Sequence, residues 1–215
     1  MTKDIYTENP DVDPDTLTNL GPLARLAGVW EGRGVDRHPV AEGSEDEPYI
    51  ERMEFEPIDP QSNGPQVLYG LRYHVFVTKV GETETFHDQV GYWLWEPATK
   101  TVVQTLAIPR AQVAMASGTA EPDARRFTVR AKLGSPTFGI CSAPFLHENF
   151  KTLEYVMTVT VNADGTLGYQ QDTVLQIADR SEPFHHTDEN TLHKIGAPRP
   201  NPRQAGRNAV EGKGG

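Results

Sequence analysis

Two adjacent histidines, His185 and His186, are the first candidates for chemistry in this sequence. Histidine is a common metal ligand, and its ordinary pKa lies close to neutral pH. The pair lies in the segment EPFHHTDEN, which also fits a surface loop whose turn is fixed by Thr187 and Asp188. A ligand role and a loop role therefore both stay open for the two imidazoles.

The other reactive side chains stand alone. Cys141 is the single cysteine, so a disulfide within the chain and a multi-cysteine zinc site are excluded. No base lies near it in the sequence, and we expect a small buried hydrophobe rather than a nucleophile. The sequence has no Gly-x-Ser-x-Gly elbow, phosphate-binding loop or His-Glu-x-x-His helix. Four isolated histidines are interpreted as ordinary sheet or loop residues: His38, His74, His147 and His193.

The composition limits the class of protein. Among 215 residues, Lys and Arg number 20 and Asp and Glu number 30, which gives a formal net charge of −10. This acidic balance argues against a nucleic-acid-binding protein or a basic membrane-surface protein. No apolar run is long enough for a membrane span, and the first residues lack the features of a signal peptide. We therefore expect an acidic, soluble, cytoplasmic protein, and the sequence leaves monomer and homodimer open.

Strand-like segments follow one another from Gly28 onward. Ten of them are rich in Val, Thr, Tyr, Phe or Trp, and turn residues such as those at 162–165 separate them. No helical periodicity intervenes, which favours antiparallel neighbours. Because an open sheet of this size would leave two long edges, we predict an all-β protein with a ten-stranded antiparallel up-and-down β-barrel.

The ends of the chain differ in composition from the middle. Residues 15–27 carry leucines at three-residue steps around Gly21-Pro22, which predicts one or two broken helical turns. Residues 1–14 and 197–215 are polar and rich in Pro or Gly, and we expect disordered tails there. The predicted barrel domain spans residues 15–196.

The predicted strands are too polar for a barrel filled by its own side chains. Pairs such as Gln104-Thr105 and Gln170-Gln171 place polar groups on both faces of a strand. An interior partly open to a ligand explains this composition better than a solid core or a purely structural barrel. The apolar segment 134–151, interrupted by prolines, could fold over the barrel mouth as a lid.

Gly28, Trp30, Gly32 and Gly34 alternate along one predicted strand, so all four face the same side. Glycine weakens a strand, and three on one face indicate a bend or a close approach by another segment or a ligand. Trp30 among them could plug one end of the barrel. The structural use of these residues in barrel closure is the stronger of the two interpretations.

At this point the sequence resembles the nitrobindin family, haem-binding barrels related in shape to fatty-acid-binding proteins. The family motif Gly-x-Trp-x-Gly-x-Gly after a short Leu-rich helix is matched at all four positions of residues 28–34. A second family pattern is matched by His87-Asp-Gln-Val-Gly91-Tyr92, then by a strand ending at Pro109 and another ending in Gly118-Thr119. The segment NTLHKI is similar to the family's closing strand.

The resemblance implies a ferric haem b at the barrel mouth with one axial histidine just before the last strand. It also implies a peroxynitrite isomerase, which handles nitric oxide or peroxynitrite and converts the latter to nitrate. When NTLHKI is aligned with the family's closing strand without a gap, Thr187 lies at the axial position. A shift of one residue in the preceding loop places His186 there, and a shift of two residues places His185 there. Hairpin loops tolerate such shifts, and His186 is preferred with His185 as the second choice, although a one-residue slip within a strand reverses the direction of the side chain.

The resemblance further implies a set of cavity residues. His87 matches a position on the far side of the iron, where it could donate a hydrogen bond to a bound ligand. A cross-strand partner on a half-buried sheet is the alternative role for His87. Phe86, Ile108 and Ile177 lie near other positions of the family's pocket, although strand parity lets only some of them face inward.

A second function fits the same barrel. A haem-free intracellular carrier would hold a hydrophobic small molecule such as a fatty acid, and its carboxylate would need a buried cation. Arg72, Arg130 and Lys132 lie on predicted strands and could serve, although the surface is the default place for each.

Overall fold

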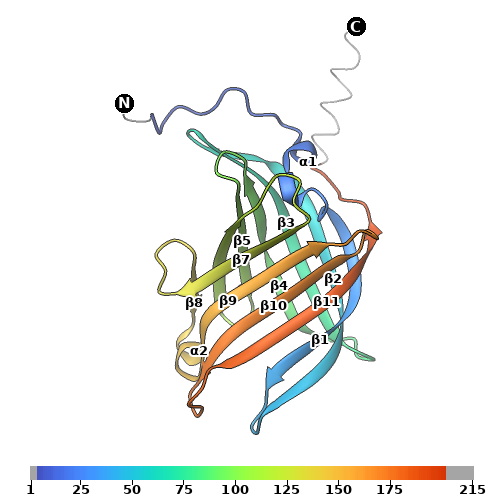
Figure 1. Cartoon of the computed structure of the whole chain (residues 1–215), viewed down its shortest axis with the longest axis vertical. Coiled ribbons are helices and arrows are strands. Elements are labelled where there is room, and N and C mark those ends of the chain that lie inside the picture. Colours follow the sequence, from blue (N-terminus) through green and yellow to red (C-terminus); the bar gives the residue numbers. More distant parts are fainter. Residues whose placement is uncertain (1–3, 202–215) are drawn as a thin grey trace.

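The computed structural model describes residues 4–201 and folds into one closed β-barrel (Figure 1). Each strand lies antiparallel to its neighbours, except that the short β8 runs parallel to β7. The strands are β1 (Gly28–Pro39), β2 (Ser44–Asn63), β3 (Gln66–Lys79), β4 (Thr85–Glu96), β5 (Thr101–Ile108), β6 (Gln112–Thr119), β7 (Arg126–Leu133), β8 (Gly139–Ser142), β9 (Phe150–Val161), β10 (Leu167–Ile177) and β11 (Phe184–Gly196).

The strand order confirms the predicted all-β barrel, but the number of strands was wrong. Eleven strands follow the order β1-β11-β10-β9-β7-β8-β6-β5-β4-β3-β2, and β1 closes the barrel by pairing with both β11 and β2. The additional strand is β8, which lies in the segment where Pro136, Gly139 and Pro144 predicted no regular strand. Its four residues fit between the two prolines and bridge β6 and β7.

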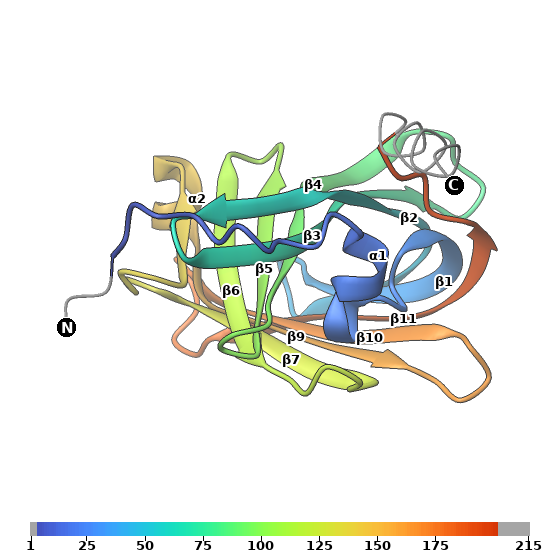
Figure 2. The same cartoon turned by 90° about the horizontal axis from the view of Figure 1, so that it is seen from above.

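One end of the barrel is filled. The helix α1 (Thr16–Asn19) and the 3₁₀ turn η1 (Gly21–Leu23) lie at this end, and in Figure 2 α1 lies within the outline of the strands. Leu20 and Leu23 are fully buried there. The Trp30 side chain joins this core and its Nε1 donates a 2.7 Å hydrogen bond to the carbonyl oxygen of Leu26. Burial of these apolar side chains away from water closes this end.

The opposite end carries the second helix, α2 (Pro144–Asn149), which lies far from α1 in Figure 1. Between the filled end and α2 the interior is hollow, as the polar strand composition predicted. The barrel is therefore asymmetric along its axis, with a packed half and an open half.

Parts of the two predicted tails contact the barrel. In the N-terminal segment, the Ser62 hydroxyl donates a hydrogen bond of 2.7 Å to Glu8. In the C-terminal segment, Arg199 forms an ion pair of 2.9 Å with Glu56. The boundaries of the domain and the disorder of the tails stay predictions, and residues 1–3 and 202–215 lie outside the described residues.

Candidate functional site

A cavity of about 510 Å³ occupies the open half of the barrel. This volume lies within the usual range of small-molecule and cofactor pockets. Apolar side chains from many strands and from α2 form most of its wall, and they include Met53, Val75, Val77, Leu106, Ile108, Ala114, Ile140, Phe145, Leu146, Phe150, Met157 and Leu175.

The His185–His186 pair lies on strand β11, so the interpretation of these residues as a loop was wrong. Side chains alternate along a strand, and the two imidazoles therefore point to opposite faces. His186 lines the cavity together with Asp188. His185 lies on the exposed side, where its Nδ1 is 2.7 Å from Asp172 Oδ2.

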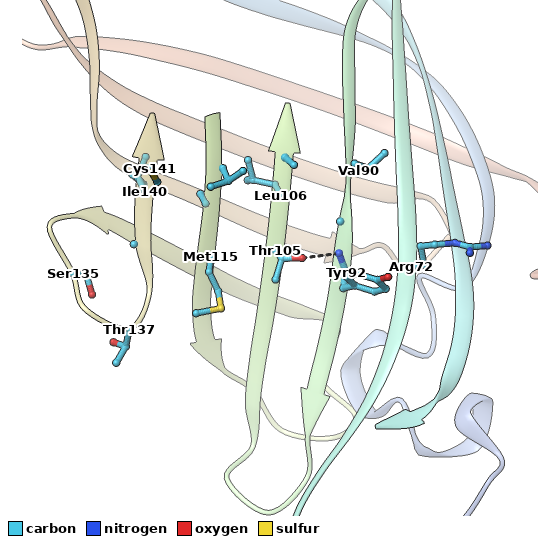
Figure 3. A pocket seen from close by; sticks show the side chains of 15 residues that line it. Arg72, Val90, Tyr92, Thr105, Leu106, Met115, Ser135, Thr137, Ile140 and Cys141 are labelled. Atoms are coloured by element: carbon cyan, nitrogen blue, oxygen red, sulfur yellow. Dashed lines mark hydrogen bonds between the residues drawn. The ribbon is translucent and has the colours of Figure 1, made fainter. Parts of the chain in front are cut away.

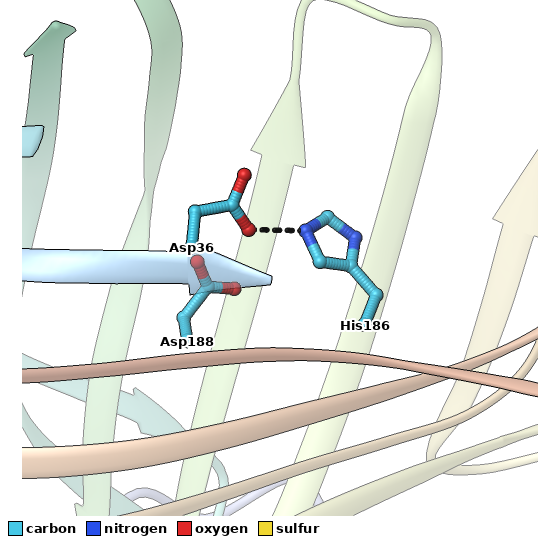
Figure 4. Close-up of side chains that lie close together, drawn as sticks. All are labelled: Asp36, His186 and Asp188. Atoms are coloured by element: carbon cyan, nitrogen blue, oxygen red, sulfur yellow. Dashed lines mark hydrogen bonds and ion pairs between the residues drawn. The ribbon is translucent and has the colours of Figure 1, made fainter. Parts of the chain in front are cut away.

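His186 meets two aspartates at the cavity wall (Figure 4). Its Nε2 is 2.6 Å from Asp36 Oδ1, and one carboxylate oxygen of Asp188 completes a group whose ligand atoms lie within 4.8 Å of one another. Strand register explains the convergence, because Asp36 on β1 is directly paired with Asp188 on β11. His38, two residues farther along β1, places its Nδ1 3.2 Å from Asp36 Oδ2.

The charges of this cluster depend on one another. Burial raises the pKa of Asp188 to about 8, and the neighbouring charge of Asp36 adds to that increase. Burial also opposes ionisation of Asp36, but the hydrogen bond and positive charge of His186 hold the pKa of Asp36 below its usual range. For His186, burial is outweighed by the Asp36 hydrogen bond and the Asp188 and Asp36 charges, so its pKa is raised. The raised pKa of His186 and the lowered pKa of Asp36 both favour a charged Asp36–His186 pair, and the raised pKa of Asp188 favours its protonated form.

A second polar group lies deeper in the cavity. Glu51 is only 3% exposed, and its Oε2 accepts hydrogen bonds from Tyr169 at 2.9 Å and from Asn190 at 2.8 Å. The Tyr49 hydroxyl lies 2.7 Å from that of Tyr169 and extends the network. Burial raises the pKa of Glu51 to about 7, although both hydrogen bonds oppose this increase. Glu51 therefore changes its charge near neutral pH inside the barrel.

The glycine motif gives this network its space. A Cβ atom on Gly34 would lie 2.4 Å from Cζ of the Tyr49 ring, and one on Gly32 would lie 2.5 Å from the carbonyl oxygen of Thr191. Gly28 has a φ of +131°, which side chains rarely permit. The predicted close approach thus comes from other strands of the barrel.

His87 lines the cavity from strand β4. In the barrel, β1, β2 and β3 lie between β4 and the strand that carries His186. Burial, reinforced by the positive charge of Arg110, lowers the pKa of His87. One imidazole with a lowered pKa and one with a raised pKa therefore lie on different walls of one cavity.

The structure places the other expected cavity residues as follows. Phe86 and Ile108 line the cavity with His87. Ile177 is not among the lining residues, and Leu175, two residues earlier on β10, is.

The segment predicted as a lid forms β8 and α2. Phe145 and Leu146 of α2 and Phe150 at the start of β9 line the cavity, so this segment covers its wall at the open end. Cys141 was expected to be buried, and that expectation was wrong, because the side chain is exposed. It lies on a separate groove of about 680 Å³ over β4, β5, β6 and β8, where Figure 3 also shows Tyr92 and Met115.

The three cations considered for a carrier lie on the outer surface. Arg130 and Lys132 are exposed and face Glu154 at 3.4 Å and 3.7 Å, and Arg72 is exposed beside the outer groove. Two other cations, Lys79 and Arg110, line the cavity. Lys79 is paired with Glu47 at 3.1 Å, and Arg110 donates a 3.1 Å hydrogen bond to the carbonyl oxygen of Phe86.

Sequence reasoning missed the acidic residues of the cavity. The sequence analysis gave no site role to Asp36 or Glu51, because charged residues on strands are usually exposed, or to their neighbour His38, and it considered Asp188 only as a turn residue. A signal was present, since the alternation from Gly28 to Gly34 continues on the same face to Asp36 and His38.

This fold and this cavity define a ligand-binding β-barrel with histidines on two walls. The chain matches the model of the THAP4-like, heme-binding beta-barrel domain over residues 19–194, and it belongs to that family. Membership of this family supports haem binding. It also confirms the resemblance to the nitrobindin barrels.

A solved structure shows the same fold. The crystal structure of Rv2717c from M. tuberculosis has a TM-score of 0.58 and 20% sequence identity, and the match covers 84% of this chain and 98% of that one. No curated protein matches the sequence. Neither helix of the described residues has the length and hydropathy of a membrane-spanning helix.

Proposed function

We propose that the cavity binds haem b. His186 would be the axial ligand of the iron, and His87 would lie on the opposite side of the iron, where a small ligand binds. The observation that carries this proposal is the placement of both imidazoles on the wall of one cavity of about 510 Å³. Handling of nitric oxide and isomerisation of peroxynitrite to nitrate belong to the same proposal, as does action in the cytoplasm.

The residues present fit haem after one local change. Apolar side chains dominate the wall, as a porphyrin requires, and Lys79 and Arg110 supply positive charge for its carboxylates. The Nε2 atom of His186 is occupied by Asp36 at 2.6 Å. This hydrogen bond must open before the same nitrogen can bind iron.

The chain's own residues account for the chemistry around the ligand. Ferric haem b held by the His186 imidazole would supply an iron that can bind a small ligand. His87 is held neutral by burial and by Arg110, so it can donate a hydrogen bond to a ligand oxygen without adding a positive charge. Phe145 and Phe150 add apolar surface to the cavity wall.

Titration with haemin tests the binding step. We expect the full-length protein to develop a sharp Soret band with haemin at a 1:1 ratio, and the His186→Gln variant to lack it. His185→Gln is the matched control, because this neighbouring imidazole lies outside the cavity, and it should retain the band. A normal band in His186→Gln would contradict the axial assignment.

Product analysis tests the reaction. The haem-loaded protein should accelerate the decay of peroxynitrite in stopped-flow measurements and give nitrate as the product. His87→Phe keeps an apolar wall but removes the hydrogen-bond donor, and it should slow the reaction by at least about tenfold. An unchanged rate in this variant would leave His87 without a role in the reaction.

The haem-free carrier is the second candidate. It is favoured by the Asp36–His186 hydrogen bond, which occupies the Nε2 atom of His186. In this function Arg110, rather than Arg72, Arg130 or Lys132, would meet a ligand carboxylate, because it lines the cavity. Mass spectrometry of ligands extracted from the purified protein separates the two functions, since a fatty acid without haem supports the carrier.

A further inference from the structure

Asp36, His186 and Asp188 form a group of metal-ligand type on the cavity wall. The two aspartates come from the paired strands β1 and β11, so the barrel backbone fixes their separation. One ligand atom from each of the three side chains lies within 4.8 Å of the other two, as Figure 4 shows, and the three residues are partly buried. Two carboxylates and one imidazole are donors that first-row divalent cations accept together.

The group lacks a fixed positive charge. Among residues 4–201, no lysine or arginine lies within ion-pair distance of Asp36 or Asp188. The partners of the two carboxyl groups are imidazoles, each other and the Gln171 amide, which donates to Asp188 at 3.0 Å. Carboxylates in a half-buried wall are stable when paired with a cation or coordinated to a metal. A divalent cation would supply positive charge to both carboxylates, whereas the His186 imidazole is within ion-pair distance of Asp36 alone.

A second observation points to a missing ligand at the same place. The Nδ1 atom of His38 is buried without a hydrogen-bond partner in the described part of the chain, although it lies 3.2 Å from Asp36 Oδ2. Buried polar atoms in native structures nearly always have a partner, and an ion or water accounts for many exceptions. His38 therefore either orients Asp36 toward a cation or joins its ligands.

We propose that, in the haem-free protein, Asp36, His186 and Asp188 bind one divalent transition-metal ion of the Zn²⁺ class, with His38 positioning Asp36. Three protein ligands leave a coordination position open toward the cavity, as in many zinc enzymes. Ligand atoms on one Zn²⁺ ion lie about 3 to 3.5 Å apart. The Asp36–His186 contact of 2.6 Å must therefore widen, and Asp188 must approach.

The cation and haem exclude each other. Both need the Nε2 atom of His186, and this consequence alone rests on the proposed haem function. Binding of the cation does not require haem, so it can be tested in the haem-free chain.

Calorimetric titration of the metal-free, full-length protein with Zn²⁺ tests the site. We expect one saturable site per chain and a loss of affinity of more than about tenfold in Asp188→Asn and in Asp36→Asn, since even outer partners of metal ligands contribute that much. Asp172→Asn is the matched control, because it alters the outer His185–Asp172 pair, and it should leave the affinity unchanged. Failure to saturate, or equal affinity in all four proteins, would overturn the site.

NMR spectroscopy of the wild-type protein tests the site even if the substituted proteins do not fold. In the wild-type protein, Zn²⁺ should shift the ring nitrogen NMR signals of His186 and leave those of His185 in place. A shift at His185 alone would place the ion on the surface and overturn the proposal. In a separate experiment, Zn²⁺ should slow the appearance of the Soret band, and a protein that binds Zn²⁺ but never gives this band would contradict the haem function only.

Discussion

Two histidine–aspartate pairs, made by adjacent histidines, lie on opposite faces of the same strand. His186 and Asp36 are 2.6 Å apart at the cavity wall, and His185 and Asp172 are 2.7 Å apart on the outside. The exposed fraction of the imidazole is 25% for His186 and 62% for His185. The chemistry of the two pairs is the same, so the difference between them comes from the surroundings.

Exposure to solvent determines how much each ion pair contributes to the stability of the protein. An exposed ion pair gains little, because solvent screens it and two side chains must be held in place. Breaking a buried pair leaves a charge without its partner, and this is costly. The inner pair has further titratable groups next to it, Asp188 and His38, and protonation of one group in this cluster changes the pKa of others.

Removal of the inner imidazole should give the largest effect on stability. His186→Ala leaves Asp36 and Asp188 facing each other without a positive charge, and we expect the free energy of unfolding to fall by about 3 to 4 kcal/mol at pH 7. Urea denaturation measures this change. A loss below about 1 kcal/mol would show that the inner pair behaves like the outer one.

Glu51 extends the comparison to a buried carboxyl without an imidazole. The pKa of Glu51 in the folded protein is about 7, above the ordinary value of 4.5. The stability that the protonated side chain contributes is therefore complete below pH 4.5, and it is lost as the pH rises through 7. Glu51→Gln should therefore match the wild type near pH 4.5 and exceed it by about 3 kcal/mol at pH 8. Urea denaturation at the two pH values checks this.

The control for this substitution is Glu31→Gln on the outer face of β1, where the side chain pairs with Arg52. It should change the stability by less than about 1 kcal/mol at both pH values. A constant difference between Glu51→Gln and the wild type across this range would show that Glu51 is already charged at pH 5.

A steric clash at Gly34, on the inner face of β1, should give the next largest effect on stability. Gly34→Ala places a methyl group 2.4 Å from the Tyr49 ring, and we expect a loss of about 2 kcal/mol in thermal or urea unfolding. Gly168→Ala is the control, because its nearest atom would be at 3.6 Å, and it should be neutral or stabilising by about 0.5 kcal/mol. Equal effects would show that glycine flexibility, and not space, decides at Gly34.

The smallest effect belongs to the outer pair. His185→Gln should lower the free energy of unfolding by less than about 1 kcal/mol, and the difference from the wild type should shrink in 0.5 M salt because the pair is screened. A loss as large as that of His186→Ala would remove the distinction between the two faces.

The fold was predictable because the strands carry their own signals. Alternation, β-branched residues and turn chemistry gave the barrel, and the glycine motif gave its close contacts. Strand β8 was missed because four residues between two prolines hold too little pattern to show pairing. That pairing depends on β6 and β7, which lie outside the local sequence.

The site was only partly predictable. His186 was preferred over His185 by the resemblance, but the inward direction of its side chain depends on where β11 begins, and pairing with β10 determines that start. Asp188 was interpreted as a turn residue because the local sequence does not show that β11 begins before it. Glu51 shares its face with Met53 and Phe55, so parity could have placed it inside, but the hydrogen bonds that stabilise it come from strands far along the chain.

The short strand β8 also makes one seam of the barrel weaker than the others. Between β6 and β7 only Ser117 and Arg130 are in register, and β8 joins these strands through a few residues on either side. Backbone amides at this seam should therefore exchange with deuterium before those of β1 and β2, which are paired over their whole shared length. Transient opening of the barrel wall between β6 and β7 would let a small gas molecule reach the cavity through the side of the barrel, without a movement of α2.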